Sequence, residues 1–144
     1  MRANMTTIPT PPILNTNLIS EVSTAGKVPP TPLRITRDGD LDLVFRGWKV
    51  ASGTCGDRES ERDWTRWTEV TLYVSDTGRL VCSVQRHSKW QGQGSRYEAS
   101  SHTSFAEVIR ELRDGEGRLG PASKLMVEEA ANFESLADED VERL

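Results

Sequence analysis

Two cysteines and two histidines are the residues of this sequence that could bind a transition metal. They are Cys55, Cys82, His87 and His102. Structural zinc sites bring ligands together as short pairs such as Cys-x-x-Cys, and no such pair occurs here. Cys82 and His87 are separated by an odd number of positions, so on one β-strand their side chains project from opposite faces. The sequence therefore predicts neither a metal site nor a bound cofactor.

A cysteine nucleophile is the second chemistry that these residues could support. Cys55 lies in a glycine-rich stretch close to Asp57 and Glu59, and a cysteine becomes an activated nucleophile only beside a base. His87 or His102 could be that base if the fold brought it to Cys55, but no spacing requires this. The carboxylates after Cys55 alternate with arginines, a pattern typical of solvated loops. A small hydrolase that uses Cys55, Asp57, Glu59 or His87 is the third-ranked hypothesis.

An aromatic and basic group of side chains is the best candidate binding site. Trp and Arg are favoured at protein interfaces because they bury a large area and pair well, and aromatic rings also stack on nucleobases. A structural role is the alternative, in which Trp67 and His87 form a cross-strand pair and Trp90 covers the end of the hairpin. The predicted binding residues are Trp67, Tyr73, Arg86, His87, Lys89, Trp90 and Arg96.

Charge and composition restrict the partners. The chain of 144 residues has 22 acidic and 18 basic residues, and eleven of the acidic residues fall within residues 104–144. Duplex nucleic acid is bound mainly through Lys and Arg, so this distribution argues against a duplex partner. The acidic end forms a solvated helical face or docks on a basic partner.

The N-terminal segment is rich in proline. Six of the seven prolines fall within residues 1–32, where they interrupt both helix and strand patterns. The sequence therefore predicts a flexible Pro-rich arm over residues 1–32 and a single domain over residues 33–144. The apolar pairs Ile13-Leu14 and Leu18-Ile19 of this arm could dock on the body or on a partner, and a homo-oligomer through the arm is possible.

The same sequence favours a cytoplasmic protein without membrane contact. No apolar run approaches the roughly 18–20 residues that a membrane-spanning helix needs. The first 20 residues also lack the apolar centre of a secretory signal. Two cysteines are too few for a disulfide scaffold, as is usual in a reducing compartment.

Strands are predicted between about residues 40 and 102. In LDLVFRGWKVAS, Leu41, Leu43 and Phe45 alternate, and the following GTCGDRESERD reads as an exposed loop. In WTEVTLYVSDTGRLVCSVQRH, the residues SDTG form the turn of a β-hairpin. A fourth strand is predicted in SRYEASSH. The register expected for the hairpin pairs Val74 with Leu80, Leu72 with Cys82, and Val70 with Val84 on one face, and Tyr73 with Val81, Thr71 with Ser83, Glu69 with Gln85, and Trp67 with His87 on the other.

Helices are predicted between about residues 104 and 144. Ser104 and Glu107 match a capping box, and Gly115 or Gly117 ends the helix that follows. Pro121 suits the first turn of the next helix. The residues expected to pack in these helices are Phe105, Val108, Ile109, Leu112, Leu125, Met126, Ala130 and Phe133. The predicted fold class is α+β: an antiparallel sheet of about four strands, followed by two or three C-terminal helices packed on one face.

The strings RWTEVTLY, TGRLV and RHSKWQG resemble those of a loose group of small uncharacterised bacterial proteins, often of phage- or plasmid-like origin. The resemblance covers residues 45–130 and implies an accessory protein of a bacterial mobile element, without implying any catalytic residue. A double-stranded RNA-binding fold also has strands followed by a helix, but SFAEVIREL lacks its lysine-rich helix start.

We therefore expect a non-enzymatic binding protein that recognises a protein partner, as a regulator or inhibitor. The alternative is a module that binds a small ligand or a nucleotide on the aromatic and basic face of the sheet.

Overall fold

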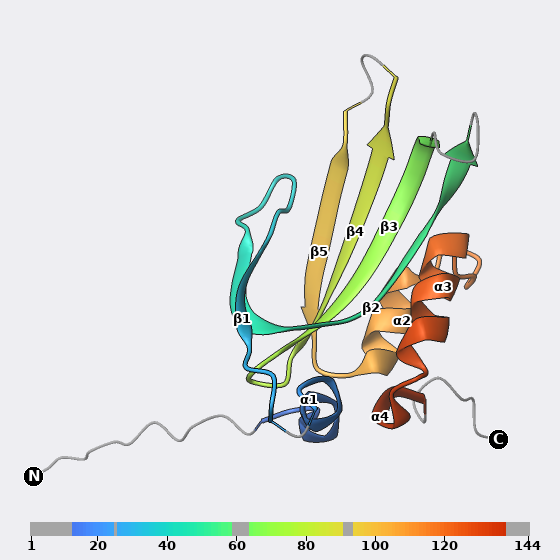
Figure 1. Cartoon of the computed structure of the whole chain (residues 1–144). Helices are drawn as coiled ribbons and strands as arrows, with labels where there is room; N and C mark the ends of the chain where they lie inside the picture. The colour runs from blue at the N-terminus through green and yellow to red at the C-terminus, as the bar shows by residue number, and fades with distance from the viewer. Residues whose placement is uncertain (1–12, 25, 59–63, 91–93, 138–144) are drawn as a thin grey trace, which may run out of the picture.

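The computed structural model describes residues 13–24, 26–58, 64–90 and 94–137. Its centre is an antiparallel sheet in which each strand pairs with the next along the chain (Figure 1). The strands are β1 (Thr31–Ile35), β2 (Leu43–Arg58), β3 (Trp64–Ser75), β4 (Leu80–Ser88) and β5 (Arg96–His102). The helices are α1 (Thr16–Val22), α2 (Phe105–Leu112), α3 (Pro121–Ala130) and α4 (Glu134–Ala137). None of these helices is long and apolar enough to cross a membrane.

The α+β class is as predicted, but the sheet has five strands and not about four. The additional strand is β1, which pairs with residues 43–47 of β2. Its sequence contains Pro32, and proline cannot donate a hydrogen bond to a sheet, so β1 suits the edge position that it occupies. The short strand and its proline give a weak local signal, and only the pairing with β2 reveals it.

The hairpin of β3 and β4 has the predicted register. All seven expected pairs are present, from Val74 opposite Leu80 to Trp67 opposite His87. Gly78 in the turn has a φ of 86°, a left-handed conformation that glycine adopts without steric cost. The predicted division of these strands into an apolar and a polar face therefore holds.

The helices α2 and α3 cover the apolar face. The core between them and the sheet contains Val50, Ala51, Val70, Leu72, Val74, Leu80, Cys82, Phe105, Val108, Ile109, Ala122, Met126, Val127 and Ala130. Ser104 caps α2 as predicted, because its hydroxyl accepts the backbone N–H of Glu107. Pro121 begins α3, also as predicted.

Leu125 was expected to pack in the core, and this expectation is wrong. Its side chain is 44% exposed, whereas Ala122 and Met126 are buried. The backbone of α3 lies against Gly53 of β2, and at this level β2 is an edge strand because β1 pairs only with residues 43–47. The face of α3 that carries Ala122 and Met126 therefore meets the sheet, and the side chain of Leu125 extends past the edge of the sheet.

The opposite face is also partly buried, because the sheet curls on itself. A β-bulge between Lys49 and Ala51 interrupts the pairing of β2, and the β1–β2 hairpin stands beside β5 (Figure 1). The backbone N–H of Asp38 donates to the carbonyl of Tyr97 at 2.9 Å, and the N–H of Tyr97 donates to the Asp38 carboxylate at 2.9 Å. This face is therefore the inside of a half-closed barrel and not an open surface. Its buried residues include Ile35, Val81 and Ser83.

The stretch GTCGDRESERD is a strand as far as Arg58, which corrects the predicted exposed loop. Residues 53–58 pair with β3, and this pairing overrides the low strand preference of glycine and charged residues. Cys55 consequently lies on β2 opposite Thr68. The remaining residues of that stretch, 59–63, lie outside the described residues.

The described part of the predicted N-terminal arm packs on the body. Leu18 of α1 is completely buried and belongs to the core. The side-chain amide of Asn15 donates to the carbonyl of Gly78 at 2.7 Å and to that of Thr103 at 3.1 Å. Burial of Leu18 and these bonds offset the entropy lost when the segment is ordered. The domain thus begins before Leu33, and only residues 1–12 and Ala25 of the arm lie outside the described residues.

Gly53 provides a test of the contact between α3 and β2. A Cβ atom at this position would clash with the carbonyl oxygen of Ala122 and lie 2.6 Å from the backbone nitrogen of Met126. We expect Gly53→Ala to lower the free energy of unfolding by about 1–3 kcal/mol, the usual cost of overpacking. Urea denaturation followed by circular dichroism measures this change.

Gly115→Ala is the matched control, because a Cβ atom there meets no atom within 4 Å. Its free energy of unfolding should change by less than about 0.5 kcal/mol. If the two variants were equally stable, the close approach of α3 to β2 would be contradicted.

Candidate functional site

The structure divides the predicted binding residues between the two faces of the sheet. Trp67, Tyr73 and His87 lie on the face away from α2 and α3, as predicted. Arg86 precedes His87 on β4 and therefore lies on the helix face, and Arg96 is directly opposite it on β5. The arginines and the aromatic rings consequently cannot hold one small ligand between them.

Trp67, His87 and Tyr97 form a row across three strands. The rings of Trp67 and His87 stack with centroids 5.0 Å apart, and His87 meets Tyr97 edge-on at 5.9 Å. The His87 Nδ1 atom is 3.0 Å from the Ser95 hydroxyl oxygen, and its Nε2 atom is 3.1 Å from the Gln85 side-chain oxygen. These contacts use both ring nitrogens of His87 and hold the ring faces against one another. They agree with the structural alternative, a cross-strand pair that stabilises the sheet.

The other predicted residues of this group lie apart from that row. Tyr73 packs edge-on against Phe45 at 6.0 Å, and burial raises the pKa of its hydroxyl. Lys89 and Trp90 follow the end of β4, where the Lys89 nitrogen is 5.5 Å from the centroid of the Trp90 ring. Trp90 is 47% exposed. Residues 91–93, which follow Trp90, lie outside the described residues.

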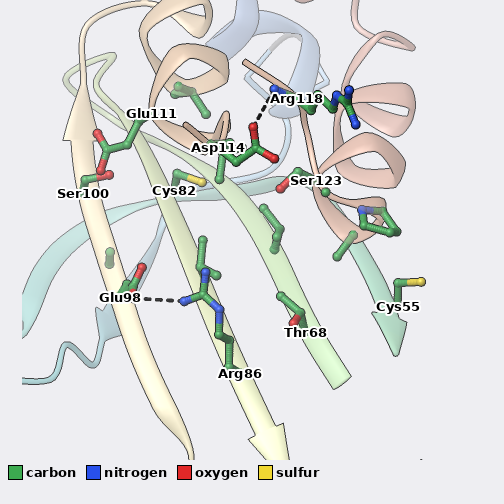
Figure 2. A pocket seen from close by; sticks show the side chains of 18 of the residues that line it. Cys55, Thr68, Cys82, Arg86, Glu98, Ser100, Glu111, Asp114, Arg118 and Ser123 are labelled. Carbon is green, nitrogen blue, oxygen red and sulfur yellow. Dashed lines mark hydrogen bonds and ion pairs between the residues drawn. The ribbon is translucent and has the colours of Figure 1, made fainter. Parts of the chain in front are cut away.

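A cavity of about 510 Å³ lies on the helix face, between the sheet and the layer of α2 and α3 (Figure 2). This volume lies in the range typical of sites for small organic molecules. The apolar part of its wall comes from Val70, Cys82, Val84, Val108, Leu112, Pro121 and Ala122. The polar part comes from Thr68, Arg86, Glu98, Ser100, His102, Glu111, Asp114, Arg118 and Ser123.

The open end of the cavity carries an ion pair. The Nη1 atom of Arg86 is 2.9 Å from the Oε1 atom of Glu98, and the two side chains are 51% and 64% exposed. Figure 2 shows this pair linking β4 and β5 at the end opposite Asp114 and Arg118. Exposed pairs of this kind add little stability, so the pair is open to exchange with a ligand.

The end of the cavity away from Arg86 carries a second group of polar side chains, on β5 and α2. The Nε2 atom of His102 is 2.8 Å from the Ser100 hydroxyl and 3.0 Å from the Oε2 atom of Glu111. Either atom of the Ser100–His102 bond can be the donor, because a neutral imidazole carries its proton on one of its two ring nitrogens. The contacts of His102 with Ser100 and Glu111 join β5 to α2.

The turn between α2 and α3 forms the rim of the cavity. The Asp114 carboxylate accepts the backbone N–H groups of Glu116 at 2.8 Å and Arg118 at 3.0 Å. These bonds, with that from Arg118 contributing most, hold the pKa of the Asp114 carboxyl below its usual value. The carboxylate is thus engaged in shaping the turn.

Both cysteines line this cavity, although the sequence suggests no link between them. Burial, with a smaller contribution from the negative charge of Glu111, raises the pKa of the Cys82 thiol to about 12. A thiol in this state is a poor nucleophile at neutral pH. Cys55 is half-buried at the β2 side of the cavity (Figure 2).

Comparisons with protein-family models, with curated proteins and with solved structures found no match to this chain. The resemblance to small bacterial accessory proteins therefore stays a prediction. Among the described residues, no group of three or more His, Cys, Asp or Glu side chains could hold a metal ion. The function has to be argued from the geometry of the cavity.

Sequence reasoning identified only Arg86 among the cavity residues as a binding residue. The alternation of β4 and β5 places Arg86, Glu98 and Ser100 on the helix face, so this part of the wall had a detectable signal. No sequence signal indicated that Cys55 lines the cavity, because its glycine-rich segment is typical of a loop. Glu111 and Asp114 belong to elements whose distance from the sheet no local pattern specifies.

Thiol reactivity tests the placement of the two cysteines. At pH 8 we expect a disulfide reagent to modify Cys55 quickly and Cys82 only when the protein unfolds, because Cys82 is 4% exposed and stays protonated. Absorbance of the released thiolate measures both phases. Cys55→Ser should remove the fast phase, and Cys82→Ser should leave it unchanged. A fast phase that persisted in Cys55→Ser would contradict the burial of Cys82.

Proposed function

We propose that this protein is a non-enzymatic binding protein that holds a small organic molecule in the cavity between the sheet and the helices α2 and α3. The observation that supports this proposal is the cavity itself. It combines a volume of about 510 Å³ with an apolar wall and polar groups at its two ends. Sites for small ligands have this composition, since apolar area supplies affinity and a few polar groups orient the molecule.

The chemistry of the cavity wall favours binding over catalysis. The Cys82 thiol stays protonated at neutral pH. Asp57, proposed from the sequence for a hydrolase, lies on β2 and does not line the cavity. If the resemblance to small bacterial accessory proteins holds, the protein would be a regulator of a bacterial mobile element whose action depends on the ligand of this cavity.

A substitution that fills the cavity tests this proposal. Val84 lines the cavity and is only partly buried, so Val84→Phe places a ring in the ligand space. Small molecules found by saturation-transfer NMR with the wild-type protein should lose at least about tenfold in affinity, equivalent to about 1.4 kcal/mol. Val44→Phe makes the same change at a strand position that is 71% exposed and outside the cavity, and should bind like the wild type.

Thermal unfolding of both variants confirms that they are folded. Ligands that bound Val84→Phe as tightly as the wild type would place the binding site elsewhere. Failure of the wild type to bind any member of a diverse library would contradict the proposal.

A protein partner is the second candidate, and the β1–β2 hairpin favours it. Leu41 and Val44 on this hairpin are 82% and 71% exposed. Large apolar side chains exposed together often mark an interface. A partner bound here would contact the hairpin and not the aromatic row, whose side chains are partly covered.

The double variant Leu41→Ser, Val44→Ser distinguishes the two candidates. If a partner docks on the hairpin, a protein that co-purifies with the wild type should be lost with this variant and retained with Val84→Phe. Quantitative mass spectrometry of the purified complexes measures both. A partner retained equally by the hairpin variant would contradict docking at this site.

A further inference from the structure

We propose that the ligand of the cavity is an amphipathic anion, with a carboxylate or phosphate head and an apolar body, and that Arg86 and Arg96 bind the head. This inference rests on the proposed function, because it names the chemical class of the ligand in the same cavity.

The two arginines form an arrangement that costs stability without an anion. Arg86 and Arg96 lie directly opposite each other on β4 and β5. Like charges at opposite positions of neighbouring strands destabilise a sheet. Glu98 bonds one nitrogen of Arg86, and no ion pair joins Arg96 to another residue of the described ranges. Since each guanidinium has five N–H donors, the pair retains donors for a second anion.

The apolar part of the cavity begins next to these arginines. Arg86 belongs to the cavity wall, and Arg96 is its neighbour on β5 just outside the residues that line the cavity. Val84, two positions along β4, lines the cavity from the same face as Arg86. Further inward, Cys82 continues the floor on the same strand, and Leu112 of α2 contributes to the wall. Moving inward from the open end, a molecule therefore meets charged donors first and apolar side chains next. This order fits a charged head followed by an apolar body.

The acidic side chains at the other end of the cavity already contact donors of the protein. The Asp114 carboxylate accepts two backbone N–H groups of its own turn. The Glu111 carboxylate lies 3.0 Å from the Nε2 atom of His102. The N–H donors of Arg86 that Glu98 leaves unused, with those of Arg96 beside it, favour an anion as the ligand. Glu98 competes with an incoming anion for Arg86, and its removal should strengthen binding of that anion.

Four probes with the same tail test the head group: octanoate, octyl phosphate, octanol and octylammonium, each below its critical micelle concentration. Isothermal titration calorimetry should show octanoate or octyl phosphate binding about tenfold more tightly than octanol, the worth of one charge-assisted hydrogen bond. Comparison of the two anions identifies the preferred head. Added salt should weaken the binding of the anions and leave that of octanol unchanged.

Three charge variants assign the head to the arginines. Arg96→Gln and Arg86→Gln should bring the affinity for the anion down to that for octanol, and Glu98→Gln should raise it. Arg110→Gln is the control, because it removes an exposed positive charge from α2 and leaves the arginine pair on β4 and β5 intact. Its affinity for the anion should match that of the wild type.

The outcomes separate this inference from the proposed function. Binding of octanol or octylammonium at least as tight as that of the anions, and blocked by Val84→Phe, would overturn the anion inference and leave the cavity as a binding site. An equal loss of anion affinity in Arg110→Gln and Arg96→Gln would also overturn it, because it would indicate an effect of net charge. Binding of none of the four probes would overturn the anion inference, whereas the proposed function is contradicted only if the diverse library also gives no ligand.

Discussion

The contact between the backbone of α3 and strand β2 at Gly53 determines how the helices lie on the sheet. Without a side chain at this position, α3 rests directly on β2 through Ala122 and Met126. The helix layer touches the sheet closely along β2. Over β4 and β5, α2 and the turn that follows it do not fill the space above the sheet, and this space is the cavity (Figure 2). A larger residue at Gly53 would lift α3 and change the wall on which the proposed ligand depends.

The curl of the sheet is the second constraint, and it separates two kinds of chemistry. The β1–β2 hairpin bonds to β5 through Asp38 and Tyr97, so the face away from the helices is partly enclosed (Figure 1). Trp67 and His87 stack inside this enclosed face. Arg86 projects from the other face, into the cavity. One sheet thus carries a stabilising aromatic row on one side and a charged, ligand-sized space on the other.

Local patterns were sufficient for the elements whose signals are local. The turn residues around Gly78 and the alternation of β3 and β4 specify one register, because a slip by one residue would bury Glu69 and Gln85. The cap at Ser104 depends on residues within a single turn. In contrast, β1, the second half of β2 and α1 form because distant segments pair with them or bury them. The sequences of β1 and of the second half of β2 contain proline, glycine and charged residues, whose local preferences favour loops, and α1 follows directly after a proline-rich segment.

Local sequence is enough to tell which side chains share a face of the sheet, because the period of two along a strand is a property of the backbone. On this basis Cys82 is separated from His87, and Trp67 is grouped with His87. What covers each face depends instead on the packing of whole elements. The height of α2 above β4, the curl that brings Asp38 to Tyr97, and the cavity between Arg86 and Glu111 all depend on contacts between residues far apart in the chain. Such contacts follow from how whole elements pack, and no sequence pattern within one element specifies the distance between two elements.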